Sequence, residues 1–394
     1  MKKSLLESHR IQELLSRGVE EIINRDNLEN KLKTGKKLRV KLGIDPTSPN
    51  IHLGRSIPLL KLKDFQELGH KVILVIGDFT GLIGDTSDKD SERPMLSEET
   101  VKKNLKTYIN QASKIIDIDL AEIHYNSEWL AGLGYMDIGR QADVFSLNEF
   151  ISRENISRRL NRGKRVSLRE LLYPLMQGYD SVKVRADVEV GGTDQRFNLL
   201  TGRDVQRLYG QEPQDILTNP LIEGLDGRKM SSSFGNTINL FDTFNDMFGK
   251  IMSLKDDLII KYFTLLTRVE MKTIDEYKSQ LSSGANPRDI KMKLAFEIVR
   301  MYHSEKDADI ARNYFVKTFT HKEVPSDIPQ FKPVSYNIIS ILVESRLVSS
   351  KSEARRVINH GGVKIDGEVI KEINYVVPSG SVLKKGKIKF LKIL

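Results

Sequence analysis

Residues 38–55 read LRVKLGIDPTSPNIHLGR, and this stretch decides which class of fold the sequence predicts. Leu38–Ile44 has the aliphatic composition of a strand. The turn Asp45-Pro46-Thr47 follows, and a helical pattern then extends from about His52 to Leu68, where Gly69 ends it. A strand that passes through a short turn into a helix begins an alternating α/β arrangement.

Later segments repeat this alternation of strands and helices. Val72–Ile76 is a continuous apolar run, typical of a strand that is buried on both faces. Ser97 can cap a following helix, and Ile123–Tyr125 is a further strand. We therefore expect an α/β fold with a Rossmann-like, doubly wound parallel sheet. Ligands of such sheets lie at the carboxyl ends of the strands, which here are the turns after Ile44 and Ile76.

The bulk composition indicates a globular protein with two or three domains. The chain has 394 residues, of which 39% are hydrophobic and 29% are charged. It has no cysteine, which excludes disulfides, thiolate nucleophiles and cysteine-based zinc sites. The net charge of +9 favours a polyanionic partner such as nucleic acid, although a generally basic proteome explains the charge equally well.

The N-terminal segment predicts neither export nor membrane insertion. Lys2 and Lys3 resemble the start of a signal peptide, but no apolar core follows them. Apolar residues between Leu5 and Ile23 recur at helical spacing among charges, which predicts one amphipathic surface helix. The sequence contains no run of the roughly 20 apolar residues that a membrane span needs. We expect a cytoplasmic protein with no membrane partner.

The C-terminal part predicts a helical region, a linker and a small basic module. Helical patterns dominate from Asn239 to Phe319, and three prolines between residues 320 and 333 mark a linker. Beyond the linker, Ser350–Glu353 is a helix capping box, and Asp366-Gly367 predicts a two-residue hairpin. From residue 351 onward ten lysine and arginine residues face four acidic residues, a net of +6 that is typical of a surface in contact with phosphates.

A second polar motif, Lys229-Met230-Ser231-Ser232-Ser233, complements the helix start at His52. An enzyme that activates a carboxylate with ATP needs positioning and cations, because the substrate carboxylate is itself the nucleophile. Backbone N–H groups at a helix start attract phosphate, and Gly54 leaves room for a nucleotide. Lys229, Lys89 and Arg93 are candidate cations for the leaving pyrophosphate.

These two motifs, His52–Arg55 and Lys229–Ser233, resemble the two ATP-binding signatures of class I aminoacyl-tRNA synthetases. Read together with Tyr173, Gln177 and Asp180, the chain resembles the bacterial tyrosyl-tRNA synthetases over nearly its whole length. The resemblance implies a tyrosine–tRNA ligase, which activates tyrosine with ATP to tyrosyl-adenylate and transfers the tyrosyl group to the 3′ end of tRNA(Tyr).

The resemblance also implies roles for residues around the nucleotide. It assigns the chemical step to His52, Lys89, Arg93 and Lys229. It assigns ATP binding to Asp45, Thr47, His52, Gly54, Arg55, Gly192, Asp194, Lys229, Met230, Ser231 and Ser232. The family usually has a second histidine where Arg55 stands and a second lysine where Ser232 stands, so the resemblance leaves the exact roles of these two residues open. Mg²⁺ is implied as the counter-ion of ATP, and no dedicated metal-ligand cluster is seen in the sequence.

Tyr173, Gln177 and Asp180 stand at i, i+4 and i+7, which places them on one face of a helix. The resemblance assigns tyrosine binding to this face and to three further residues, giving the set Lys41, Asp85, Tyr173, Gln177, Asp180 and Gln195. Within the set Asp180 accepts from the phenol, while Tyr173, Gln177 and Asp85 face the ammonium group. Lys41 stands where the familiar form of the family has a tyrosine. Asn126 matches a position beside the ribose.

On this resemblance the chain divides into four parts. Residues 1–225 form the Rossmann-like catalytic domain, 226–320 the ATP loop and a helical domain, 321–335 a linker, and 336–394 a small α+β RNA-binding domain. RNA contacts are expected at Lys351, Arg355 and Arg356. The family is homodimeric, and residues 137–161 are the expected interface.

Two alternatives remain open at this point. A tryptophanyl-tRNA synthetase is disfavoured by the basic C-terminal module and by the set Tyr173, Gln177 and Asp180. A catalytically inactive paralogue that only binds RNA would have no need of pyrophosphate cations. The residues that argue against it are Asp85, Lys89, Arg93, Asp194 and Lys229.

Overall fold

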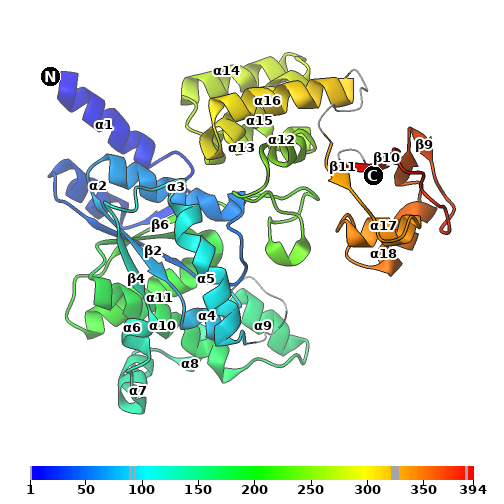
Figure 1. Cartoon of the computed structure of the whole chain (residues 1–394). Helices are drawn as coiled ribbons and strands as arrows, with labels where there is room; N and C mark the ends of the chain where they lie inside the picture. Colours follow the sequence, from blue (N-terminus) through cyan, green and yellow to red (C-terminus); the bar gives the residue numbers. More distant parts are fainter. Residues whose placement is uncertain (1, 88–90, 92–94, 321–327, 387–388) are drawn as a thin grey trace. The chain divides into compact units, whose positions relative to one another are not determined.

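The computed structural model describes residues 2–87, 91, 95–320, 328–386 and 389–394 (Figure 1). They form two compact units. Unit 1 comprises the chain as far as Thr243 together with Lys250–Ser304, and unit 2 comprises Phe244–Gly249 and Glu305–Leu394.

Unit 1 is built on a six-stranded sheet with the strand order β1-β6-β5-β2-β3-β4. The strands are β1 (Glu21–Ile23), β2 (Arg39–Ile44), β3 (Lys71–Ile76), β4 (Glu122–Tyr125), β5 (Val188–Gly192) and β6 (Asp215–Asn219). Neighbouring strands from β6 to β4 pair in parallel, and β1 pairs antiparallel with β6. The predicted doubly wound sheet is thus confirmed, with one antiparallel strand at its edge.

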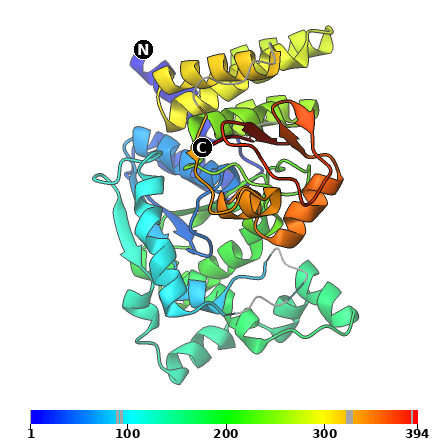
Figure 2. The same ribbon diagram turned by 45° about the vertical axis from the view of Figure 1, so that its right-hand side comes forward.

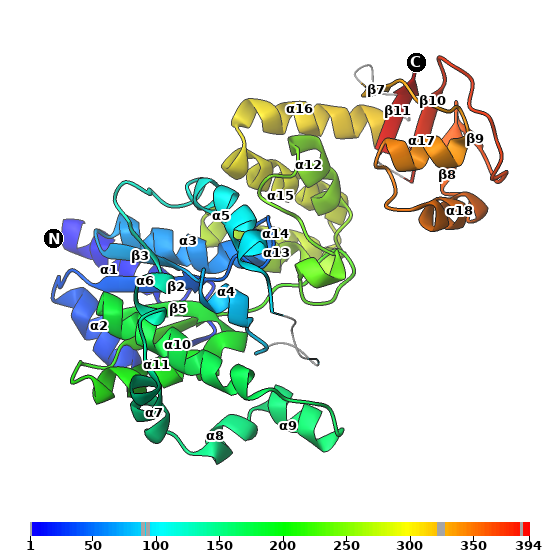
Figure 3. The ribbon, with the colours of Figure 1, turned by 60° about the horizontal axis from the view of Figure 1, so that its bottom comes forward.

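Helices cover both faces of this sheet. α3 (Leu53–Glu67) contacts β2, β3 and β5, whereas α11 (Arg196–Leu208) contacts β5 and β6 and packs along α10 (Leu168–Val184). Figure 3 shows α3 on one side of the sheet and α10 and α11 on the other. Because both faces are covered, β3 is buried from Val72 to Ile76, as its unbroken apolar run predicted.

The N-terminal segment corrects one prediction. The pattern from Leu5 to Ile23 predicted a single helix, but α1 spans Lys2–Leu14 and the chain then enters the sheet as β1. Gly18, with φ +62°, lies in the connection, and the N–H of Glu20 donates to the carbonyl of Thr218 (2.8 Å). The pairing partner β6 lies far downstream, so local periodicity could not reveal it.

The remaining helices of unit 1 are α2 (Arg25–Lys33), α4 (Thr80–Ile83), α5 (Glu98–Ala112), α6 (Ser127–Leu130), α7 (Tyr135–Asp143), α8 (Leu147–Ile151), α9 (Glu154–Asn161), α13 (Ile259–Leu266), α14 (Met271–Ser282) and α15 (Pro287–Tyr302). Ser97 caps α5 by accepting from the N–H of Thr100, as predicted. In Figure 2, α7–α9 and α13–α15 lie at opposite ends of the unit.

Unit 2 contains a five-stranded sheet with the order β7-β11-β10-β8-β9. Its elements are α12 (Phe244–Met252, of which the first six residues belong to this unit), α16 (Glu305–Phe315), β7 (Gln330–Phe331), α17 (Ile338–Glu344), α18 (Lys351–Asn359), β8 (Val363–Ile365), β9 (Glu368–Val369), β10 (Val382–Lys385) and β11 (Lys389–Ile393). Asp366 and Gly367 both have positive φ between the antiparallel strands β8 and β9, which confirms the predicted hairpin. Ser350 caps α18 by accepting from the N–H of Glu353, also as predicted.

Candidate active site

A cavity of about 260 Å³ opens in unit 1 at the carboxyl ends of β2, β3 and β5. Its lining comes from segments that are far apart in the chain: the turn after β2, the start of α3, the face of α10, the end of β5 and the segment around Lys229. This is the edge of the sheet where ligands of doubly wound folds lie. The sequence analysis predicted a ligand site at the turns after Ile44 and Ile76, and residues of both turns line this cavity.

Arg55 holds the turn that follows β2. Its guanidinium donates to the carbonyl of Asp45 (3.2 Å), to the hydroxyl of Thr47 (2.9 Å) and to the phenol of Tyr108 (2.8 Å). The planar fork of arginine allows these three bonds at once. In this structure Arg55 thus fixes the shape of the turn as well as lining the cavity.

Asp45 is held by two side-chain donors. It accepts from the hydroxyl of Thr80 (2.8 Å) and from the phenol of Tyr173 (2.8 Å). A Cβ atom at Gly77 would lie 2.0 Å from the Asp45 carboxylate, so only glycine fits beside it. The carboxylate that the sequence assigned to ATP therefore has a defined orientation.

His52 and Gly54 lie together at the N-terminal end of α3. His52 is the N-cap residue, and a Cβ atom at Gly54 would lie 3.1 Å from its ring. The backbone N–H of Gly54 points to the sulfur of Met230 (3.3 Å). The first predicted motif thus touches the second directly.

The segment around Lys229 also lines the cavity. The ammonium of Lys229 pairs with Asp194 (2.8 Å), which follows β5. The hydroxyl of Ser232 donates to that of Ser48 (3.3 Å), in the loop after β2. The Lys229 segment thus contacts both the turn after β5 and the loop after β2.

Two residues that the sequence analysis did not identify, Asn236 and Asp226, shape the segment around Lys229. The side chain of Asn236, which is 2% exposed, accepts from the N–H of Ser231 (2.9 Å) and donates to Asp226 (2.7 Å) and to the carbonyl of Lys229 (3.0 Å). Hydrogen bonds from Asn236 and Arg228 lower the pKa of Asp226 to about 2. Asn236 stands three positions after the serine-rich motif ends, and no sequence pattern singles it out.

Tyr173, Gln177 and Asp180 share one face of α10 and line the cavity, as their spacing predicted. Asp180 is 3% exposed, and two side chains donate to it: the indole N–H of Trp129 (2.8 Å) and the amide of Asn126 (3.3 Å). Sequence reasoning missed Trp129. The available signal was its place one turn after Asn126 in the short helix α6.

Burial raises the pKa of Asp180 to about 7. The neighbouring Lys41 ammonium and the hydrogen bonds from Trp129 and Asn126 act in the opposite direction. Burial, reinforced by the nearby carboxylates of Asp45 and Asp85, raises the pKa of Tyr173 as well, so its hydroxyl remains a donor.

Asp85 faces the same cavity from the loop after α4. One of its oxygens accepts from the backbone N–H (3.0 Å) and hydroxyl (2.6 Å) of Ser87, and the other accepts from the amide of Gln195 (2.7 Å). Gly192 stands close by, where a Cβ atom would lie 2.5 Å from the Asp194 carboxylate. The predicted residues of the β5 turn and of the α4 loop are therefore brought together.

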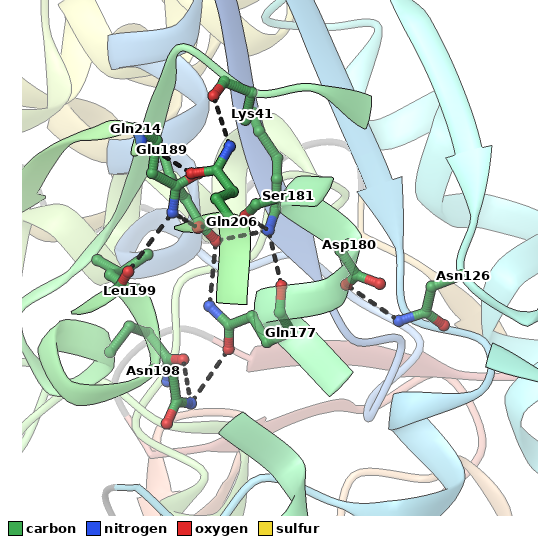
Figure 4. Close-up of polar contacts among 12 residues, drawn as sticks. Lys41, Asn126, Gln177, Asp180, Ser181, Glu189, Asn198, Leu199, Gln206 and Gln214 are labelled. Atoms are coloured by element: carbon green, nitrogen blue, oxygen red, sulfur yellow. Dashed lines mark hydrogen bonds and ion pairs between the residues drawn. The ribbon is translucent and has the colours of Figure 1, made fainter. Parts of the chain in front are cut away.

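Lys41 is the predicted site residue whose placement differs most from the expectation. Its side chain is fully buried and lies behind the cavity wall, where its ammonium pairs with Glu189 (3.0 Å), a residue that does line the cavity (Figure 4). Lys41 is therefore not among the residues that line the cavity, and its ion pair with Glu189 connects it to the cavity wall. Glu189, a charge within the apolar strand Val188–Gly192, was the signal that sequence reasoning overlooked.

The other predicted residues fall into two groups. Lys89 and Arg93 fall outside the described residues. Lys351, Arg355 and Arg356 are exposed on α18 of unit 2. In the described part of the chain, no group of three or more His, Asp or Glu side chains is arranged to hold a metal ion. None of the helices described there combines the length and the apolar composition of a membrane span.

Comparison with known proteins gives consistent matches along the chain. A family model described as tRNA synthetases class I (W and Y) matches residues 33–320, and a model of the S4 domain matches residues 338–383. A tyrosine–tRNA ligase of Thermotoga maritima is 47% identical to this chain and one of Carboxydothermus hydrogenoformans 48%, with 96% and 97% of each chain covered. The fold is similar to that of a tyrosyl-tRNA synthetase from Archaeoglobus fulgidus, solved with L-tyrosine, at a TM-score of 0.62 and 24% identity over 77% of this chain and 99% of that one.

Proposed function

Because the chain belongs to the class I tRNA synthetases, and within them to the tyrosine–tRNA ligases, we propose that the described cavity is where L-tyrosine and ATP react. The protein is an ATP-dependent tyrosine–tRNA ligase. The curated relatives, at 47% and 48% identity, favour this activity over the tryptophanyl alternative.

One observation carries the proposal for the site. A single cavity is lined by the helix start at His52, by the cation Lys229 and by the polar face of α10 with Asp180. A carboxylate held on the α10 side can attack the α-phosphorus of an ATP held on the other side. A bond forms between the carboxylate oxygen and phosphorus, and the bond from phosphorus to the pyrophosphate oxygen breaks. The reaction requires no base, because the nucleophile is already ionised.

We assign the phosphates to the start of α3 and to the Lys229 segment. Backbone N–H groups of a helix N-terminus favour anions, and Lys229 adds a positive charge near the leaving pyrophosphate. The sequence adds Lys89 and Arg93 to this group. The turn residues Asp45, Thr47 and Arg55, with the lining residues Gly192, Asp194, Met230, Ser231 and Ser232, form the rest of the ATP site in this proposal. Mg²⁺ accompanies ATP and is held chiefly by phosphate oxygens and water.

We assign the tyrosine to the α10 side of the cavity. The phenol donates to Asp180, and the ammonium group faces Tyr173, Gln177 and Asp85. Gln195 binds near the carboxylate end of the substrate. Lys41, which the sequence placed among the contacts, supports this wall from behind.

The test is pyrophosphate exchange into ATP, measured with each amino acid in turn. We expect L-tyrosine to stimulate the exchange strongly and L-phenylalanine and L-tryptophan to give little or none. Stimulation by tryptophan in place of tyrosine would contradict the assignment of the α10 face. Absence of exchange with every amino acid would contradict catalysis in this cavity.

The raised pKa of Asp180 predicts a pH dependence of tyrosine binding. The phenol needs an ionised acceptor, and the free enzyme takes up a proton at Asp180 as the pH falls through about 7. We therefore expect KM for tyrosine to rise by up to about tenfold per pH unit below 7, while KM for ATP changes little. Pyrophosphate exchange between pH 5.5 and 8.5 measures both constants. In Asp180→Asn the inflection should vanish, and its persistence would assign the titration to another group.

We propose a homodimer whose interface includes α7–α9. Large apolar side chains stand exposed along these helices and the start of α10: Tyr135, Met136, Val144, Leu147, Leu160 and Leu168. Tyr135 is 95% exposed and Leu168 77%, which is unusual for side chains of this size in a monomer. Because the family is homodimeric, we expect a second copy of the chain to cover these side chains.

We propose that the S4 domain carries the RNA contacts. The exposed lysine and arginines of α18, Lys351, Arg355 and Arg356, can reach phosphates of tRNA(Tyr). We also propose the four-part division of the chain, with boundaries after residues 225, 320 and 335. We also propose a cytoplasmic location, because the relatives with the same activity are bacterial tyrosine–tRNA ligases.

A further inference from the structure

A buried ion pair lies behind the proposed tyrosine site. Lys41 of β2 and Glu189 of β5 stand opposite each other in the parallel register of the two strands, so both side chains leave the sheet on the same face. Both side chains are at most 1% exposed, and their charged groups are 3.0 Å apart. A buried pair of this kind contributes little net stability, so its value lies in the geometry that it imposes.

The ammonium of Lys41 uses all three of its N–H groups. Besides Glu189, it donates to the hydroxyl of Ser181 (2.7 Å) and to the backbone carbonyl of Gln177 (3.0 Å), both on α10. Figure 4 shows these contacts converging on the ammonium. The strand β2 is thereby tied to the turn of α10 that carries Gln177.

The carboxylate of Glu189 is also fully engaged. One oxygen accepts from Lys41 and from the side-chain amide of Gln177 (3.2 Å). The other accepts from the hydroxyl of Ser181 (3.1 Å) and from the amide of Gln214. Each of these oxygens thus has two donors, which is what its lone pairs can accommodate.

This arrangement fixes the orientation of the amide of Gln177, a residue that lines the cavity. An ionised carboxylate only accepts hydrogen bonds, so Glu189 must face the NH₂ group of Gln177. The amide oxygen then points the other way, where it accepts from the amide of Asn198 (3.1 Å). An amide oxygen has two lone pairs, so it can accept from a second donor besides Asn198.

We propose that Lys41 and Glu189 are positioning residues that hold the Gln177 oxygen toward the ammonium group of tyrosine. The inference rests on the proposed placement of that ammonium group. With the pair intact, the cavity presents an acceptor to the substrate cation. Without it, Gln177 can rotate and present its NH₂ group, which repels a cation. The pair thereby sets the preference for an α-amino acid over the same acid without its amino group.

The experiment compares two probes, L-tyrosine and 3-(4-hydroxyphenyl)propionate, which differ only in the ammonium group. Their dissociation constants are measured on the full-length protein by calorimetry or by inhibition of pyrophosphate exchange. In Lys41→Met and in Glu189→Gln we expect the affinity ratio of the two probes to fall roughly 10- to 100-fold, the size of one hydrogen bond to a charged group. The propionate should bind nearly as it does to the wild type.

A matched control is Lys61→Met. Lys61 is another buried lysine of unit 1, 3% exposed, and it pairs with Asp64 (3.1 Å) away from the cavity. We expect its probe ratio to equal that of the wild type. A merely structural role of Lys41 would weaken both probes together and leave the ratio unchanged, which would overturn the proposal.

A third variant covers the case in which a single substitution leaves an unpaired charge and prevents folding. The double variant Lys41→Met with Glu189→Met removes both charges, a replacement that buried ion pairs commonly tolerate. Its ratio should also fall, because Gln177 loses its acceptor. Any folded variant of the three that keeps the wild-type ratio refutes the inference, and failure of all three to fold would assign the pair to folding instead.

Gln177→Ala separates this inference from the proposed function. If this variant keeps the wild-type ratio, the ammonium group does not lie at Gln177 and the placement of tyrosine is wrong. If Gln177→Ala lowers the ratio but the Lys41 and Glu189 variants do not, the placement stands and only the positioning role fails.

Discussion

Replacement of Asp180 by alanine is expected to lower kcat/KM for tyrosine roughly 10- to 100-fold and to leave kcat/KM for phenylalanine unchanged or higher. The reason lies in the burial of Asp180, which is 3% exposed. Little water can reach this buried carboxylate, so the phenol of the substrate supplies a hydrogen-bond donor that water does not. Phenylalanine leaves the acceptor without that donor, and this penalty disappears with the carboxylate.

The measurement is pyrophosphate exchange with tyrosine and phenylalanine in separate assays, reported as the ratio of the two kcat/KM values. Asp187→Ala is a suitable control, because Asp187 precedes β5 at the other end of the strand and pairs with Lys36 (2.8 Å). Its ratio should match that of the wild type. If Asp180→Ala discriminates against phenylalanine as well as the wild type does, the phenol is not bound at Asp180.

Replacement of Lys229 by alanine is expected to slow the formation of tyrosyl-adenylate by about 10²- to 10³-fold. Its ammonium lies 2.8 Å from Asp194 at the cavity, and it is proposed to move to the leaving pyrophosphate, where negative charge develops. The family usually supplies a second lysine in this motif, but Ser232 stands in its place. We therefore expect Lys229, together with Lys89 and Arg93, to carry a larger share of the stabilisation of the pyrophosphate.

Stopped-flow or quenched-flow measurement of adenylate formation at saturating ATP isolates this effect. The dissociation constant for tyrosine should change less than about threefold, because Lys229 lies on the nucleotide side of the cavity. Lys63→Ala, which removes a partly exposed charge from α3, is the control and should keep the wild-type rate. A Lys229→Ala enzyme that forms adenylate at the wild-type rate would exclude the proposed role.

Much of the fold could be predicted from the sequence, because its signals are local. The aliphatic segment Leu38–Ile44 marked β2 and a continuous apolar run marked β3, each to within one residue. The capping residues Ser97 and Ser350 marked helix starts. The hairpin at Asp366 followed from turn chemistry alone. β1 was missed because its partner β6 is distant in sequence, and pairing at a distance leaves no periodicity.

The candidate site likewise has a part that could be predicted from the sequence and a part that could not. The spacing of Tyr173, Gln177 and Asp180 on one helix face could be predicted, because helix geometry fixes it. The contacts of Trp129 with Asp180 and of Lys41 with Glu189 could not, because each joins elements that meet only in the folded sheet. The sequence identified Lys41 as unusual, and only the structure showed its partner.

The placement of α12 has a consequence for dissecting the protein. Although α12 follows the Lys229 segment directly, its first six residues belong to unit 2, where the ring of Phe248 packs against that of Phe315 of α16 (5.6 Å between centroids). The polypeptide therefore crosses between the units more than once, and one cut cannot release either unit complete. A shortened protein that ends before Glu305 would retain Phe248 but lose the ring that covers it, so truncation experiments on the RNA-binding part should keep α16 in place.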